Sequence, residues 1–173
     1  MSLIILFGLP GTGKTYVGKV FEKYFDYYFY DGDNDLTPEM REAIQTKTVF
    51  TDAMRDVFFK RLIKKIQYLE SKIKNLVVAQ TFIKEKYRLQ LIKVIPETKF
   101  ILIETKKEIR EKRLIQRVNY PLDLKYARIM EKNFEKPIIG HFTIINDVKG
   151  DKNIQKQTEN ILQSHSRGGG NPD

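Results

Sequence analysis

The chain lacks cysteine altogether and has only two histidines among its 173 residues. Without cysteine there is no disulfide framework, no thiolate nucleophile and no cysteine-bound metal. His141 and His165 stand far apart in the sequence and do not suggest a histidine cluster. No apolar run reaches the 18 residues of a membrane-spanning helix, and the apolar start has no basic residue before it, unlike a signal peptide. We therefore expect a cytoplasmic protein that is not inserted in a membrane.

The composition predicts one folded domain. Hydrophobic residues make up 41% and charged residues 31% of the chain, which is enough to form both a buried core and a solvated surface. We expect this domain over residues 1–163 and a flexible polar tail with three consecutive glycines over 164–173. The net charge of +9 fits nucleic acid, anionic membranes or polyanionic small substrates as partners. Lysines scattered over several predicted helices are the simpler explanation.

Short apolar runs alternate with segments of helical spacing along the chain. The predicted strands are residues 3–7, 27–30, 76–79, 99–104 and 142–145. The longest predicted helix follows Thr51, and its apolar stripe consists of Met54, Phe58, Leu62, Ile66, Leu69 and Ile73. Because the strands are apolar throughout, both of their faces should be covered. This pattern predicts an α/β fold of three layers, a five-stranded parallel sheet with helices on both faces.

The sequence GLPGTGKT, between the first predicted strand and the first predicted helix, matches the G-x-x-x-x-G-K-[ST] pattern of a phosphate-binding loop, or P-loop. Glycines let such a loop wrap around phosphate with its N–H groups inward, and the helix N-terminus adds partial positive charge. Lys14 should bridge the outer phosphates, and the Thr15 hydroxyl should hold Mg²⁺. We expect ATP and Mg²⁺ as cofactors, bound by Gly8, Gly11, Thr12, Gly13, Lys14 and Thr15.

A dinucleotide-binding loop is the alternative interpretation of these glycines. Gly11 and Gly13 are followed by acidic residues about twenty positions later, as in that fingerprint. Its third glycine, however, would fall at Tyr16, and Lys14 would have no role. We therefore favour the P-loop.

Polar residues directly after the predicted strands are further candidates, because ligands bind at the carboxyl ends of parallel strands. Asp31 and Asp33 flank Gly32 after the second strand. One carboxylate can support hydrated Mg²⁺ and the other can accept a proton from a substrate hydroxyl, although an ordinary Asp-Gly turn is the alternative. Gln80 and Thr81 follow the third strand and could contact substrate.

Two arginines four residues apart, Arg113 and Arg117, lie on a basic predicted helix just before a loop. Phosphoryl transfer needs positive charge over the phosphates, often on a lid, and arginine holds phosphate oxygens in a bidentate manner. The alternative is a solvated basic helix, since several lysines share this segment.

Further segments accompany the P-loop, namely DGDNDLTP, TDAMR, VVAQTFIKEKYR, KRLIQR and NFEKP. Together they resemble the small P-loop kinases of the gluconate kinase and shikimate kinase group, with the gluconate kinase side closer, over residues 3 to about 148. The P-loop alone is specific only to the superfamily, whereas the combination of the other segments points to this group. The resemblance implies a P-loop kinase fold with a mobile lid at about 117–124.

Roles for particular residues follow from this resemblance. It implies that Asp33 contacts the acceptor and acts as base, that Asp31 supports Mg²⁺ and that Arg117 is a lid arginine. It also implies three acceptor-side residues, Arg55, Lys84 and Arg88, in addition to the candidate Thr81 after the third predicted strand. The chain departs from the family's pattern mainly in the acceptor half, where Thr37 replaces a histidine, so the departures bear on the acceptor rather than on ATP.

The sequence thus favours an ATP-dependent kinase that phosphorylates a hydroxyl of a small, anionic or polyhydroxylated molecule, a sugar acid or polyol. A nucleoside, nucleotide or nucleic-acid 5′-hydroxyl is the alternative acceptor, which the positive net charge would suit. A nucleotide-binding module without catalysis is the third hypothesis. The oligomeric state is expected to be monomer or homodimer.

Overall fold

Five parallel strands form one sheet at the centre of the computed structural model, which describes residues 2–116 and 124–164. The strand order is β2-β3-β1-β4-β5. Their bounds are β1 (Ser2–Phe7), β2 (Tyr28–Asp31), β3 (Asn75–Ala79), β4 (Lys99–Glu104) and β5 (Phe142–Ile145). Each predicted strand is present and the parallel sheet is confirmed. Because all strands run the same way, their carboxyl ends meet at one edge, where the candidate site residues follow.

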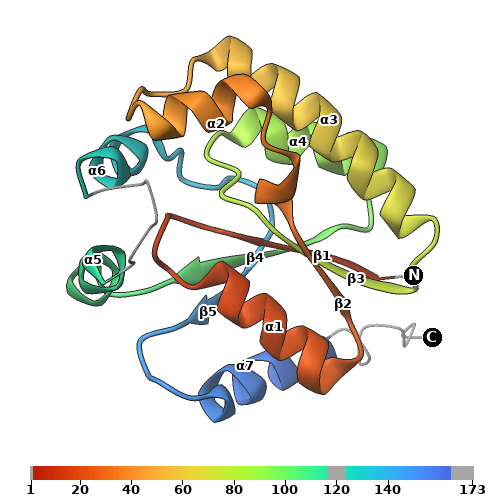
Figure 1. Ribbon diagram of the computed structural model, residues 1–173. Helices are drawn as coiled ribbons and strands as arrows, with labels where there is room; N and C mark the ends of the chain where they lie inside the picture. The colour runs from red at the N-terminus through yellow and green to blue at the C-terminus, as the bar shows by residue number, and fades with distance from the viewer. Residues whose placement is uncertain (1, 117–123, 165–173) are drawn as a thin grey trace.

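Helices cover both faces of this sheet. Their bounds are α1 (Lys14–Phe25), α2 (Pro38–Gln45), α3 (Asp52–Glu70), α4 (Glu85–Val94), α5 (Lys107–Ile115), α6 (Leu124–Asn133) and α7 (Asp151–Gln163), with a short 3₁₀ helix at Gly32–Asp35. Figure 1 shows α1 and α7 on one face and α2, α3 and α4 on the other. The helices α5 and α6 lie at the end of the sheet where β1 finishes (Figure 1). The three predicted layers are confirmed.

The central strand β1 shows why the sheet needs covering on both sides. Leu3, Ile5 and Phe7 join the apolar cluster under α3 and α4, whereas Ile4 and Leu6 join the cluster under α1 and α7. This alternation is the two-residue period of a strand whose faces are both buried. The strand therefore anchors the loop that follows it to both halves of the core.

Capping residues set where two of the helices begin. The Thr37 hydroxyl accepts a hydrogen bond from the Met40 N–H at 3.2 Å, with Pro38 as the first residue of α2. Thr51 caps α3 in the same way through the Met54 N–H at 3.2 Å. Both are helix starts of the kind that threonine favours, because its oxygen replaces a missing helical acceptor.

Three expectations fall on residues that the structure does not describe. Arg117, almost all of the expected lid at 117–124 and the expected tail after Ser164 lie outside the described residues. Within the described part of the chain, no helix combines the length and the apolar character needed to cross a membrane.

Candidate active site

The P-loop connects β1 to α1 and bends at glycines with positive φ. The φ angles are +139° at Gly8, +86° at Gly11 and +90° at Gly13. A Cβ atom on Gly8 would lie 2.6 Å from the backbone oxygen of Ile103, and one on Gly13 would lie 2.2 Å from Asn146 Nδ2. Other residues are therefore excluded at both positions by backbone conformation and by space.

The outer side of the loop is held by hydrogen bonds to one carbonyl oxygen. The Thr12 oxygen accepts from Asn146 Nδ2 at 2.8 Å, from the Thr105 hydroxyl at 3.1 Å and from Arg113 Nη1 at 3.5 Å. Arg113 Nη2 also donates to the Asn146 oxygen at 2.9 Å. Sequence reasoning missed Thr105 and Asn146, although each directly follows a strand, where site residues are expected. They fix the shape of the loop from behind.

The inner side of the loop presents donors suited to phosphate. The Lys14 ammonium bends back over the loop and donates to the Gly8 oxygen at 2.9 Å and the Leu9 oxygen at 3.0 Å. Helix α1 begins at Lys14 without a side-chain cap, because its N-cap residue is Gly13. The first N–H groups of a helix have no partner within it and attract anions. The Lys14 ammonium and the N-terminus of α1 together form a site that suits the phosphates of a nucleotide.

Asp31 connects the P-loop to the end of β2. The Thr15 hydroxyl donates to Asp31 Oδ2 at 3.1 Å, and the Asp33 N–H donates to Asp31 Oδ1 at 3.1 Å. A hydroxyl and a carboxylate side by side at a phosphate site are oxygen ligands of the kind that Mg²⁺ uses together with substrate phosphates and water. Thr15 and Asp31 therefore fit the predicted Mg²⁺ position.

Asp33 is held in place by Gln80, which follows β3. Gln80 Nε2 donates to Asp33 Oδ1 at 2.9 Å, while Gln80 Oε1 accepts from the Thr81 N–H at 2.6 Å. The strands bring them together, because Asp31 pairs in register with Ala79. Gln80 is buried and its amide group is engaged on both sides. Gln80 thus orients the Asp33 carboxylate, and its contact with substrate, considered from the sequence, stays a prediction.

We expect Gln80→Met to slow turnover by roughly tenfold, since a side chain of similar length would no longer orient the Asp33 carboxylate. Steady-state rates at saturating ATP and acceptor would measure the effect, with Gln67→Met, at an exposed position of α3, as control. Gln80→Glu should be slower still, because it places a second carboxylate against Asp33. Equal rates for wild type and Gln80→Met would mean that Asp33 needs no such support.

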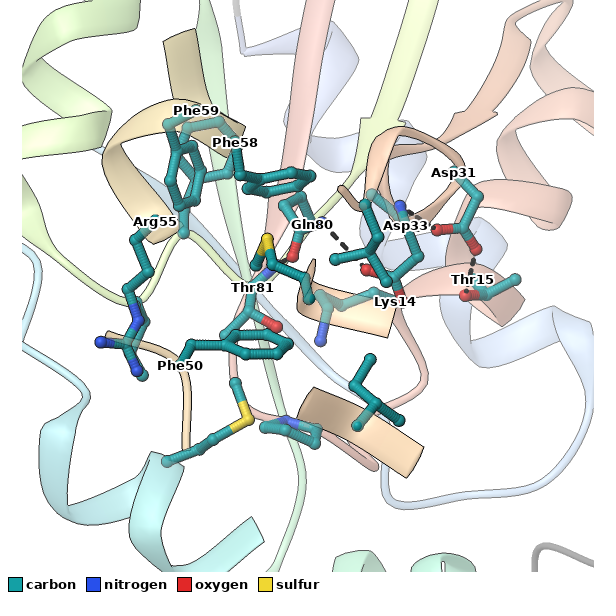
Figure 2. A pocket seen from close by; sticks show the side chains of 18 of the residues that line it. Lys14, Thr15, Asp31, Asp33, Phe50, Arg55, Phe58, Phe59, Gln80 and Thr81 are labelled. Carbon is teal, nitrogen blue, oxygen red and sulfur yellow. Dashed lines mark hydrogen bonds between the residues drawn. The ribbon is translucent and has the colours of Figure 1, made fainter. Parts of the chain in front are cut away.

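One cavity contains most of the predicted site residues. Lys14, Thr15, Asp31, Asp33, Gln80 and Thr81 line it together with Arg55. Figure 2 shows the two aspartates and Arg55 on opposite sides, with Thr81 between them. Five aromatic side chains also line it, namely Phe50, Phe58, Phe59, Phe82 and Tyr126. Aliphatic lining comes from Leu36, Met40, Ile44, Ile83 and Met130. Burial raises the pKa of the Tyr126 hydroxyl at the cavity wall.

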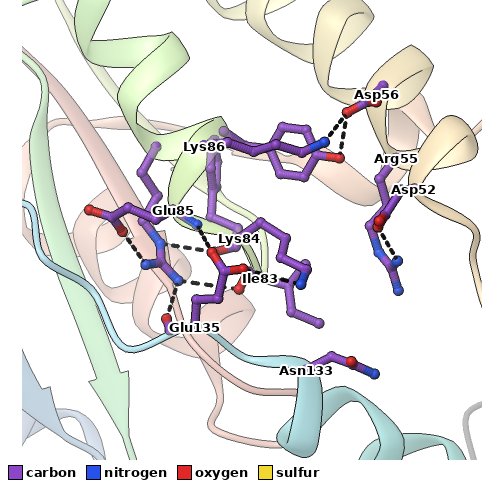
Figure 3. A network of polar contacts seen from close by, with 12 residues as sticks. Asp52, Arg55, Asp56, Ile83, Lys84, Glu85, Lys86, Asn133 and Glu135 are labelled. Carbon is purple, nitrogen blue, oxygen red and sulfur yellow. Dashed lines mark hydrogen bonds and ion pairs between the residues drawn. The ribbon is translucent and has the colours of Figure 1, made fainter.

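Arg55 projects from α3 and is buried. Its side chain is 10% exposed, and Nη1 lies 3.2 Å from Oδ1 of the exposed Asp52 (Figure 3). A guanidinium in this position can hold an anionic group bidentately. The structure thus brings Arg55 to the same cavity as Asp33, although 22 positions separate them in the sequence.

Arg88 and Lys84 belong instead to a network between α4 and the segment after α6. Arg88 is fully buried, pairs with Glu85, and donates to the Phe82 oxygen at 3.0 Å and the Glu135 oxygen at 2.8 Å. Lys84 Nζ lies 3.1 Å from Glu135 Oε1 (Figure 3). The Glu85 N–H and then Lys84 lower the pKa of Glu135. Neither basic side chain lines the cavity, and the Arg88 guanidinium is used inside the protein. The acceptor contacts that the resemblance implies for Lys84 and Arg88 stay predictions.

We expect Arg88→Met to lower the free energy of unfolding by about 3 kcal/mol, because it leaves the largely buried Glu85 carboxylate without its cation. Denaturant unfolding followed by circular dichroism would measure this. Arg128→Met is the control, since Arg128 pairs with Glu111 on an exposed face and should matter little. A stable Arg88→Met protein that had lost only acceptor affinity would instead support the acceptor role implied by the resemblance.

A second groove lies beside the P-loop. It is lined by Gly11, Gly13, Tyr16, Arg113, Gln116 and Asn146, with residues 148–150. Arg113 is thus next to the loop, and its predicted contact with the nucleotide stays a prediction. The same holds for Arg117, which lies outside the described residues.

The loop, the parallel strand order and the cavity at the carboxyl edge define a P-loop domain of the small-molecule kinase fold. A family model described as "AAA domain" matches residues 3–137, and the chain belongs to this family. A sugar kinase from Janibacter sp. is similar in structure, with a TM-score of 0.81, 16% identity and coverage of 94% of this chain and 95% of that one. A gluconokinase from Sinorhizobium meliloti has a TM-score of 0.80 at 18% identity and covers 98% of both chains.

A shikimate kinase from Acinetobacter baumannii, solved with shikimate, has a TM-score of 0.65 at 15% identity, covering 96% of each chain. No curated protein matches the chain in sequence. At these identities the structural likeness establishes a shared fold, and it confirms the fold expected from the resemblance.

Proposed function

We propose that the protein is an ATP- and Mg²⁺-dependent phosphotransferase that phosphorylates a hydroxyl group of a small acceptor molecule. The observation that carries this proposal is that Lys14 of the P-loop and Asp33 line the same cavity, with the Asp33 carboxylate held by a hydrogen bond from Gln80. A phosphate-binding loop needs no oriented carboxylate for binding alone, whereas transfer to an alcohol needs a base within reach. The sugar kinase, gluconokinase and shikimate kinase neighbours support the same reaction class.

The reaction can be assigned to residues as follows. Asp33 takes the proton of the acceptor hydroxyl, whose oxygen bonds to the γ-phosphorus of ATP while the bond from that phosphorus to the β–γ bridging oxygen breaks. Lys14 and the N–H groups at the start of α1 carry the negative charge on the phosphates, and ADP leaves. Gln80 keeps the Asp33 carboxylate directed into the cavity.

The metal would be held by the Thr15 hydroxyl, with Asp31 acting through its water ligands. Mg²⁺ supplies neutralisation of phosphate charge when it is bound. Arg117, and the lid around it, would add positive charge over the phosphates, in agreement with the resemblance. Arg55 would bind an anionic group of the acceptor.

An ATP-consumption screen tests the proposal. ADP formation would be followed with sugar acids, polyols, shikimate, nucleosides, nucleoside monophosphates and 5′-hydroxyl oligonucleotides as acceptors. Acceptor-dependent ADP formation with one of these classes is expected, and the phosphorylated product would be identified by mass spectrometry. Tight ATP binding without turnover on any acceptor would instead favour a non-catalytic nucleotide-binding module. Turnover on oligonucleotides that falls steeply with salt would favour the nucleic-acid alternative.

A further inference from the structure

The acceptor half of the cavity is lined mainly by rings. Phe58, Phe59 and Phe82 form one group, with ring centroids 5.0 Å apart in each successive pair. Phe50 and Tyr126 form another, 5.8 Å apart and edge to face. Figure 2 shows Phe58 on one side of Thr81 and Phe50 on the other. Because these rings pack against one another, the walls are preformed and do not depend on a ligand.

Polar groups are few in this half. Among the described lining residues beyond the phosphate end, polar side-chain atoms belong to Asp33, Arg55, Gln80, Thr81 and Tyr126. The Gln80 amide is already engaged with Asp33 and with the Thr81 N–H. A sugar acid carries several hydroxyls, and each one buried against carbon without a partner weakens binding by about tenfold or more. The described lining therefore does not suit a polyhydroxylated acceptor.

Arg55 is the one cationic side chain among the described residues that line this half. The Arg55 side chain is 10% exposed, and its one ion-pair partner among the described residues is Asp52, whose side chain is 69% exposed. Because the Asp52 carboxylate is mostly exposed to water, it compensates the positive charge of the buried guanidinium only weakly. Further guanidinium N–H groups can accordingly take up an anionic group from within the cavity.

We propose that the acceptor is an alcohol with a flat apolar ring and one anionic group. Its hydroxyl meets Asp33, its ring lies between Phe50 and Phe58, and its anion binds Arg55. This inference rests on the proposed kinase function, and it replaces the sugar-acid or polyol acceptor that the sequence favoured. It makes Arg55 and Phe50 the residues that determine specificity.

The test uses probes of defined shape, measured by calorimetric binding in the presence of Mg²⁺ and the ATP analogue AMPPNP. The ring probes are 3- and 4-(hydroxymethyl)benzoate, and the uncharged controls are the corresponding benzamides. Gluconate represents sugar acids and thymidine represents nucleosides. We expect at least one benzoate to bind about tenfold more tightly than its amide, gluconate and thymidine.

Two variants link that preference to residues. In Arg55→Gln, the preference for benzoate over benzamide should fall to within about threefold, whereas Arg61→Gln on the exposed side of α3 should retain it. Phe50→Ala should weaken the ring probe about tenfold, and Tyr68→Ala, which removes an exposed ring of α3, should not. Phe50 is chosen because it is less buried than Phe58, so that folding should survive.

Tighter binding of gluconate or thymidine, no binding of either benzoate, or a carboxylate preference that persists in Arg55→Gln would each overturn the proposal. Failure of the kinase function gives a different result. In that case the benzoate binds with the expected dependence on Arg55 and Phe50, but no ADP forms with ATP, which supports the ligand class and rejects the reaction.

Discussion

Lys14→Ala is expected to lower turnover by about a thousandfold or more while leaving the fold intact. The ammonium lies over the loop, within 3.0 Å of the Gly8 and Leu9 oxygens, and Lys14 lines the same cavity as Asp33. Removing it would take away the charge that, in the proposed reaction, stabilises the transferring phosphoryl group, and no hydrophobic core contact would be lost. Rates of ADP formation and thermal unfolding would be measured on the same preparations.

Lys19→Ala is the matched control, because Lys19 lies on the same helix with its side chain in solvent. It should retain wild-type turnover, which separates the local role of Lys14 from the general positive charge of the surface. Near-normal turnover by folded Lys14→Ala would rule out the P-loop as the site of transfer. A loss of turnover equal in both variants would point to overall charge instead.

The arrangement of strands and helices follows from local signals. Apolar runs such as residues 76–79 mark strands buried on both faces, and Thr37 and Thr51 mark helix starts by their capping oxygens. These signals lie within a few residues of the element that they specify, so the sequence alone predicts them. The parallel order of the sheet then brings Asp31 and Gln80 to the same edge as the P-loop.

Other parts of the site depend on contacts that are distant in the sequence. Nothing near Asn146 indicates that its amide group holds the Thr12 oxygen, 134 positions away. Arg55 and Arg88 look equivalent in the sequence, yet Arg55 opens into the cavity and Arg88 is enclosed by the carbonyls of Phe82 and Glu135. Burial and partner geometry distinguish the two arginines, and neither can be read from spacing.

The aromatic wall shows a further limit of periodicity. Phe58 belongs to the predicted apolar stripe of α3 and does pack in the core with Leu62 and Ile66. The same ring also lines the cavity beside Thr81. A period of 3.6 residues indicates which face of a helix is turned inward, but it does not distinguish a core contact from a ligand contact. The chemistry of the acceptor half is therefore visible only in the structure.

Asp33→Asn and Asp31→Asn are expected to damage the enzyme in different ways. Asparagine keeps the size of aspartate but cannot accept the hydroxyl proton, so Asp33→Asn should lower turnover by about a hundredfold or more. Affinity for the Mg²⁺–nucleotide complex should stay within a few-fold, since the role proposed for Asp33 is toward the acceptor. Asp31→Asn should instead raise the Mg²⁺ concentration needed for half-maximal rate, because Asp31 lies against the Thr15 hydroxyl.

Mg²⁺ titrations at saturating ATP and acceptor would separate these effects, with Asp35→Asn as control. Asp35 lies in the same 3₁₀ helix but accepts a hydrogen bond from the Tyr30 hydroxyl at 2.8 Å and does not line the cavity. Its substitution should change neither turnover nor the Mg²⁺ requirement. If the two site variants exchanged their effects, the roles of Asp31 and Asp33 would be reversed. If all three behaved like wild type, the Asp-Gly-Asp segment would be a plain turn, because a base or metal ligand cannot lose its charge without consequence for the rate.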